Sequence, residues 1–303
     1  MDAAAPIRVF ATDARVIDVA RPCRDHVRIE FVAPFQDAEP GQFLQLLCAD
    51  RDDSVACGAM MLRRPFSVAD FFDGGDGARH GVVISRAVGG GTRWLDRLRP
   101  GESLNMTGPL GRPFQMPEPH EHVALVGGGV GIPPMIFLAR RLREAGHLAA
   151  TAIFGALTRD LFPVPILTPP LDDGEPAPCL EIAGAPGMSA VVTTDDGTLG
   201  LPGRVTDALR RWRERHPKTA LRVYACGPDP MLKAVAALTR DWGVACALCI
   251  ERMMGCGLGT CLSCVTRVRA GADSWRWALA CGEGPVFDRD VLLDYASLTT
   301  TEP

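Results

Sequence analysis

The sequence predicts a multidomain protein of mixed α+β and α/β class: an antiparallel β-barrel, an α/β domain with a parallel sheet, and a small cysteine-rich domain. Three observations predict this architecture. Short apolar segments separated by turn residues fill about the first 115 residues. Strand-like and helix-like segments alternate from Val123 onward. Four cysteines then cluster near the C-terminus. We place the domains at residues 1–117, 118–245 and 246–303, which suits a chain of 303 residues.

Composition excludes several classes of protein. Apolar residues make up 47% of the chain and charged residues 22%, as in an ordinary globular protein. The net charge of −4 offers no basic surface for nucleic acid. The N-terminal segment carries acidic residues and does not resemble a secretory signal. The longest apolar stretch, 122–142, is interrupted by four glycines and two prolines, so no membrane partner is expected and the protein should be cytoplasmic.

The first domain is expected to be a small antiparallel barrel. Its strands are short, and glycine and proline residues separate them. One short helical segment, 91–98, interrupts the series. A proline-rich linker at 113–122 should end the domain. The predicted strands lie at 27–34, 42–48, 63–72, 80–88 and 102–108.

The second domain is expected to be a doubly wound α/β layer, because buried strands alternate with amphipathic helices. The proline- and glycine-rich stretch 158–203 is expected to form a loop. A final strand at 244–254 should lead into the cysteine segment. The other predicted strands are 122–128, 150–156 and 221–227, and the helices are 133–146, 205–216 and 229–243.

The cysteine segment carries the most specific motif of the chain. Its four cysteines are separated by four, two and sixteen residues, the spacing of plant-ferredoxin 2Fe-2S ligation. Glycines between them permit the sharp backbone turns and the close approach to sulfur that such a loop needs. Structural zinc and unmetallated thiols are the alternatives. The candidate metal ligands are Cys256, Cys261, Cys264 and Cys281, and the glycines are Gly255, Gly257 and Gly259.

The remaining cysteines are interpreted as packing residues. Cys246 and Cys249 are three apart on a predicted strand and should face opposite sides of the sheet. The eleven cysteines form an odd number in a chain without an export signal, which favours reduced thiols over disulfides. The scattered cysteines Cys23, Cys48, Cys57 and Cys179 should be small buried hydrophobic residues.

Two segments of the barrel suit a flavin nucleotide. In "RRPFSV", Arg64 can grip a diphosphate, Phe66 can stack on a ring and Ser67 can bond a ring nitrogen. In "ISRAVGGGTRWL", a strand leads through three glycines to Thr92, which opens a helix whose free N–H groups suit a phosphate. A simple glycine turn capped by the threonine is the alternative for the second segment.

Two segments of the α/β domain suit a nicotinamide nucleotide. "LVGGGVGIPPM" follows the first strand, although Pro134 stands where the Rossmann fingerprint has its third glycine. "YACGPDPML" ends a later strand at the carboxyl edge, where ligands of open sheets bind. There Cys226 either faces the nicotinamide or fills a gap in the packing.

Together these motifs resemble the ferredoxin–NADP reductase superfamily, over nearly the whole chain. Within it, the sequence is most similar to the electron-transfer subunits of NAD-dependent, class 1B dihydroorotate dehydrogenases. The segments that carry the resemblance are "RPFS", "ISR" followed by "GT", "GGGVGIPP", "TTDDGTLGLPGRVTDAL", "CGPDPML", and "ERMMGCGLGTCLSCV" with "CGEGPVF". Two features depart from the pattern: Phe66 stands where many members have tyrosine, and the segment 158–187 is long and rich in proline.

The resemblance implies an FAD-binding barrel, an NAD-binding α/β domain and a C-terminal 2Fe-2S domain ligated by the four cysteines. It gives catalytic roles to Ser67 and Cys226. It implies FAD contacts at Arg64, Pro65, Phe66, Ser67, Ile84, Ser85, Arg86, Gly91 and Thr92, and NAD contacts at Gly128, Gly129, Gly131 and Asp196.

The implied function is electron transfer in pyrimidine (UMP) biosynthesis. Electrons would pass between a dihydroorotate-oxidising flavin-barrel subunit and NAD through the cluster and FAD, in a heterotetramer of two plus two subunits. No general base for oxidising a substrate stands out here, so that chemistry is expected on the partner. One alternative is an NAD(P)H-dependent flavin and iron–sulfur reductase serving a hydrogenase or a ferredoxin. Another is a redox-sensing or zinc-stapled binding protein.

Overall fold

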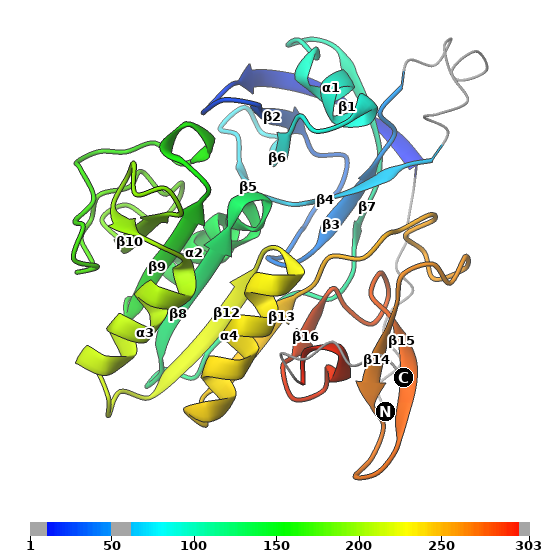
Figure 1. The fold of residues 1–303 in the computed structure, drawn as a ribbon. Coiled ribbons are helices and arrows are strands. Elements are labelled where there is room, and N and C mark those ends of the chain that lie inside the picture. The colour runs from blue at the N-terminus through cyan, green and yellow to red at the C-terminus, as the bar shows by residue number, and fades with distance from the viewer. Residues whose placement is uncertain (1–10, 50–61, 297–303) are drawn as a thin grey trace.

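The computed structural model describes residues 11–49 and 62–296. These residues form two seven-stranded sheets and one two-stranded sheet, arranged as a barrel, an α/β layer and a C-terminal hairpin (Figure 1). The predicted fold class is confirmed. Cys57 lies outside the described residues, so its predicted burial stays a prediction.

The barrel is a sheet of antiparallel strands. The segment that joins its two end strands also bonds next to both ends of the sheet, because Val68 N–H donates to Gln42 O at 3.0 Å and Ala69 N–H donates to Val82 O at 2.8 Å. The short helix α1 (Gly90–Asp96) buries Trp94 in the barrel core. The strands follow the order β4 (Arg64–Ser67), β3 (Phe43–Leu46), β7 (Ser103–Leu110), β1 (Ala11–Ala20), β2 (His26–Val32), β6 (Arg79–Arg86) and β5 (Asp70–Asp73).

Strand β1 is not among the predicted strands. Only Ala14 and Val16 of its ten residues are buried, and five of the others are exposed. Two small apolar side chains give a weak alternation signal. Pairing with β2 and β7 holds the strand in place.

The second sheet is parallel except for its last strand. Helix α2 (Ile132–Glu144) packs on one face, and α3 (Val205–Arg215) and α4 (Asp229–Asp241) pack on the other, as the separate cores of the two faces show. This confirms the doubly wound α/β layer. The order is β11 (Leu201–Pro202), β10 (Ser189–Thr194), β9 (Ala150–Ala156), β8 (His122–Gly128), β12 (Leu221–Cys226), β13 (Ala245–Cys249) and β16 (Val286–Asp288).

The prediction of an uninterrupted loop at 158–203 is wrong over β10 and β11. Strand β10 pairs in parallel with β9 along its full length, from Ser189 to Thr194. Its four β-branched residues, from Val191 to Thr194, favour a strand, but the proline and glycine residues before them indicated a loop. Residues 162–188 contain neither helix nor strand, as the loop prediction expects.

The C-terminal part, from residue 265 onward, forms a separate hairpin and then adds one strand to the second sheet. Strands β14 (Val265–Arg269) and β15 (Trp275–Leu279) form an antiparallel hairpin, and β16 then pairs antiparallel with β13. A short 3₁₀ turn, η3 (Leu293–Tyr295), follows. The division after residue 245 stays a prediction, and β13 straddles it. In the described part of the chain, no helix is both long enough and apolar enough to cross a membrane.

Candidate redox site

The four predicted metal ligands come together as two pairs. Cys256 and Cys261 form the first pair, because each backbone N–H points to the sulfur of the other at 3.4 Å. Cys264 and Cys281 form the second pair, since the Cys281 thiol, whose pKa is raised first by burial, also interacts with the adjoining Cys264 thiol. Cys281 also lies close enough to Cys256 to feel its charge. Four cysteine sulfurs in two pairs fit two irons with two protein ligands each.

Hydrogen-bond donors surround the sulfurs of the first pair. Leu258 N–H donates to the Cys256 sulfur at 3.3 Å, and the Ser263 hydroxyl lies 3.1 Å from the Cys261 sulfur. The Ser263 contact lowers the pKa of the exposed Cys261 to about 6. Burial raises the pKa of Cys281 to about 12. Within the described residues, no three His, Cys, Asp or Glu side chains are grouped as ligands of one metal ion.

The loop glycines behave as the cysteine spacing predicted. Gly257 and Gly259 adopt left-handed backbone conformations, with φ of +74° and +85°. A Cβ atom at Gly255 would lie 3.2 Å from the Cys261 sulfur. The loop therefore needs both the dihedral freedom and the space that only glycine provides.

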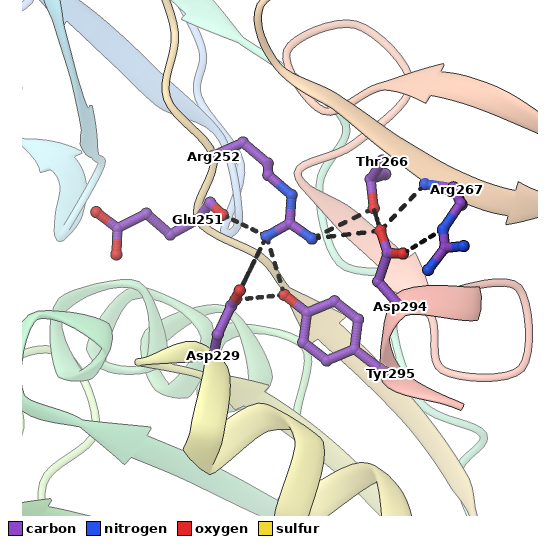
Figure 2. A network of polar contacts seen from close by, with 7 residues as sticks. All are labelled: Asp229, Glu251, Arg252, Thr266, Arg267, Asp294 and Tyr295. Atoms are coloured by element: carbon purple, nitrogen blue, oxygen red, sulfur yellow. Dashed lines mark hydrogen bonds and ion pairs between the residues drawn. The ribbon is translucent and has the colours of Figure 1, made fainter. Parts of the chain in front are cut away.

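A network of polar contacts connects the segment before this loop to the start of α4, just after β12 (Figure 2). Arg252, just before the loop, pairs with Asp229 at 3.3 Å and with Asp294 at 3.7 Å. The Tyr295 hydroxyl donates to Asp229, and Arg267 pairs with Asp294 at 2.7 Å. These residues were missed by sequence reasoning, because partners far apart in the chain leave no local signal. The network joins the cysteine segment to the start of α4.

The barrel residues that are predicted to bind a diphosphate lie close together. The Arg64 guanidinium covers the start of α1 so closely that a Cβ atom at Gly91 would lie 2.7 Å from its central carbon. Thr92 caps the same turn, because its hydroxyl oxygen accepts the N–H groups of Val88 and Gly89, both at 2.9 Å. The strand end and the glycine turn thus meet at one place, as an FAD diphosphate requires.

The neighbouring strand β6 carries polar atoms that suit a bound cofactor. Ser85 is 2% exposed, and its hydroxyl has no hydrogen-bond partner among the residues that the structure describes. The buried Nε of Arg86 also lacks one there. Ile84 packs against the core of the α/β layer, so β6 faces the second domain. Buried polar groups are nearly always paired, and the Arg86 Nε, on the same face of β6 as Ile84, fits an FAD that supplies the partner.

The other flavin candidates lie on β4, beside the same turn. Phe66 is partly buried against the barrel core, and Ser67 is partly buried at the end of the strand. Pro65 lies opposite Gln45 of β3. All the predicted FAD residues therefore lie on β4, β6 and the start of α1.

The predicted nicotinamide residues meet in part at the carboxyl edge of the second sheet. The chain leaves β8 toward β9 and later returns on the other side to β12, so ligands are expected between the ends of β8 and β12. Gly128 ends β8 and Cys226 ends β12. A Cβ atom at Gly131 would lie 2.0 Å from the Cys226 carbonyl oxygen, so only glycine fits there. Gly129 adopts φ of +53° between them.

Asp196 stands apart from this group. It follows β10, and β9 separates that strand from β8. Its side chain accepts hydrogen bonds from the Thr198 N–H at 3.1 Å and the Thr198 hydroxyl at 2.7 Å. The Thr198 hydroxyl lowers the pKa of Asp196. Asp196 thus lies on the same edge of the sheet but two strands from the glycine loop.

The packing cysteines lie largely as expected. Cys246 belongs to the core on one face of the sheet and Cys249 to the core on the other, which confirms their opposite orientation. Cys249 is the register partner of Cys226, and the hydrogen bond between the two thiols raises the pKa of Cys226. Cys48 and Cys179 are buried as predicted, whereas Cys23 is only partly buried.

A buried ion pair sets the barrel against the α/β layer. Asp70 of β5 accepts two hydrogen bonds from Arg140 of α2, at 2.5 and 2.7 Å. Their side chains are 5% and 18% exposed. An exposed pair, Arg24 and Asp160 at 3.7 Å, joins the same two domains elsewhere. Neither pair is apparent from the sequence, because the partners lie far apart in the chain; each links the barrel to the α/β layer.

Comparison with known proteins places these features in a family. Residues 251–293 match the family described as the iron-sulfur cluster binding domain of dihydroorotate dehydrogenase B. The chain is 35% identical over 283 residues to the "Dihydroorotate dehydrogenase B (NAD(+)), electron transfer subunit" of Desulforamulus reducens, covering 91% of this chain and 95% of that one. It is 34% identical to the protein of the same name from Shouchella clausii, with 82% and 85% covered.

Solved structures agree on the fold. The structure described as "Insights into flavin-based electron bifurcation via the NADH-dependent reduced ferredoxin-NADP oxidoreductase structure" superposes with a TM-score of 0.72. The two chains are 25% identical, and the match covers 92% of this chain and 89% of the other.

Proposed function

The chain belongs to the family of dihydroorotate dehydrogenase B electron-transfer subunits, and from this membership we propose that it passes electrons between a dihydroorotate-oxidising subunit and NAD. The observation that carries the proposal is the convergence of the four cysteine sulfurs in two pairs, on a loop packed against the barrel strand next to β4. A one-electron centre and a flavin site thus lie in one chain. When bound, FAD exchanges electron pairs with NADH and single electrons with a 2Fe-2S cluster.

The barrel residues hold and orient the FAD. Arg64 grips the diphosphate together with the N–H groups at Gly91 and Thr92. Phe66 packs on the ring system, and Ser67 offers it a hydroxyl group. Support for these roles comes from the closeness of Arg64 to Gly91. Pro65, Ile84, Ser85 and Arg86 complete the FAD contacts.

The α/β layer positions the nicotinamide nucleotide. Gly128, Gly129 and Gly131 leave space for its diphosphate at the switch in strand order. Cys226 borders the position of the nicotinamide ring. Asp196, two strands away, contacts the far part of the nucleotide.

The cysteine segment holds the cluster through Cys256, Cys261, Cys264 and Cys281. The N–H groups directed at the sulfurs stabilise the negative charge there. The network of Arg252 keeps this segment beside the turn that follows β12. We propose domains at 1–117, 118–245 and 246–303 for FAD, NAD and the cluster.

The partner is the catalytic flavin-barrel subunit that oxidises dihydroorotate in pyrimidine (UMP) biosynthesis, joined in a heterotetramer of two plus two subunits. The name shared by the relatives supports this partner. The ten cysteines among the described residues are all free thiols, which supports a reducing, cytoplasmic location.

Reconstitution tests the proposal. The anaerobically purified chain should carry about one flavin and about two irons, and NADH should reduce an artificial acceptor through it. It should oxidise dihydroorotate with NAD only when the catalytic subunit is added. Cys261→Ala should lose the iron and keep the flavin. Dihydroorotate oxidation by the chain alone, or a colourless protein with zinc, would contradict the proposal.

A further inference from the structure

A fully buried glutamine of the barrel has no hydrogen-bond partner within the described residues. Gln45, on β3, is 0% exposed. Neither its side-chain nitrogen nor its side-chain oxygen is paired there. Buried side-chain amides are almost always hydrogen-bonded, because leaving both ends unpaired in a protein interior is unfavourable. Such an amide indicates that something absent from the polypeptide supplies the partner.

The side chain of Gln45 points away from the barrel core. Its neighbours Leu44 and Leu46 belong to the core of the barrel. Successive side chains of a strand point to opposite faces, so Gln45 projects outward. On that side it meets the cysteine loop: a Cβ atom at Gly257 would lie 2.6 Å from the Gln45 amide nitrogen. Gly257 directly follows Cys256, and its φ of +74° turns the loop there.

Gln45 also adjoins the proposed flavin strand. It is the register partner of Pro65 on β4, one residue from Arg64. The amide therefore lies between the strand that would hold the flavin and the loop that would hold the cluster. Among the described residues, Gln45 has a buried side-chain amide without a hydrogen-bond partner, and this amide lies against the cysteine loop.

We propose that the Gln45 amide N–H donates a hydrogen bond to a sulfur of the iron–sulfur cluster on the Cys256 side. This inference rests on the proposed function, because it needs a cluster at the four cysteines. Hydrogen bonds to cluster sulfurs stabilise the more negative, reduced form and raise the reduction potential. Gln45 thus tunes the potential of the cluster from the barrel side, next to its electron donor or acceptor.

The test replaces Gln45 with methionine, which keeps the length and apolar volume of the side chain but cannot donate. Gln42→Met is the matched control, because the Gln42 amide is already paired with Gly111 O at 3.1 Å. An EPR-monitored redox titration of the holoprotein measures the cluster. Gln45→Met should lower the equilibrium constant for cluster reduction about tenfold, which is 59 mV for one electron. Gln42→Met should leave it unchanged.

Three results would overturn the inference while leaving the proposed function intact. They are an unchanged cluster potential in Gln45→Met with a normal flavin and iron content, an equal shift in Gln42→Met, and a shift of the flavin potential alone. The last result would assign the amide to the flavin. A wild-type protein without iron would instead contradict the proposed function itself.

A measurement on the wild-type protein covers the case in which Gln45→Met does not fold. The chain has four glutamines, Gln36, Gln42, Gln45 and Gln115. Labelling their side-chain amides with nitrogen-15 should add a nitrogen-15 hyperfine coupling to the pulsed EPR spectrum of the reduced cluster. Absence of any coupling would overturn the inference.

Discussion

The ion pair between Asp70 and Arg140 should contribute strongly to stability, and Asp70→Asn tests it. The substitution keeps the shape of the side chain but removes its charge, leaving the Arg140 guanidinium, whose side chain is 18% exposed, without its closest counterion. Breaking a buried ion pair costs about 3–5 kcal/mol. Arg140 keeps some solvent and a distant contact with Glu144 at 4.0 Å, so we expect a loss of about 3 kcal/mol.

Urea unfolding followed by tryptophan fluorescence measures this loss, with the slope of the transition checked in each variant. The matched control is Asp160→Asn, because Asp160 pairs with Arg24 across the same domain boundary but both side chains are more than half exposed. That variant should lose less than about 1 kcal/mol. In Asp70→Leu combined with Arg140→Met, most of the stability should return, because no buried charge is left unpaired.

Equal losses in Asp70→Asn and Asp160→Asn, or a loss below about 1 kcal/mol in Asp70→Asn, would refute this reasoning. The buried pair would then not hold the barrel against α2.

Two further predictions concern the flavin site and the response to pH. A methyl group at Gly91 would lie 2.7 Å from the Arg64 guanidinium carbon, so Gly91→Ala should weaken FAD binding about tenfold or more by calorimetry; Gly89→Ala, which meets no atom within 4 Å, should bind normally. The hydrogen bond that the His80 ring donates to the Glu30 carboxylate raises the pKa of His80, so the stability that this bond provides is full below about pH 6.5 and is lost as pH rises through the raised pKa. The urea midpoint of the wild type should therefore fall toward that of His80→Gln over this range, and a constant difference would contradict the assignment.

Local patterns determined much of the architecture. The alternation of buried strands and amphipathic helices predicted β8, α2, β9, α3, β12 and α4. Each of these elements shows its buried face in the spacing of its own apolar residues. Strand β1 was missed because only two of its residues are buried, and β10 was missed because its apolar run lies inside a stretch rich in proline and glycine; each is placed by the strands that it pairs with.

The sequence by itself determined the composition of the cysteine loop: which residues carry thiols, at what spacing, and why glycine separates them. These properties are local, since the dihedral needs of Gly257 and the order of the thiols follow from neighbouring residues. Only the tertiary structure decided what surrounds that loop. The contacts that only the structure reveals join residues far apart in the chain: Gln45 with the cysteine loop, Arg252 with Asp229, and Asp70 with Arg140. Such contacts arise from the packing of distant segments, which no local pattern encodes.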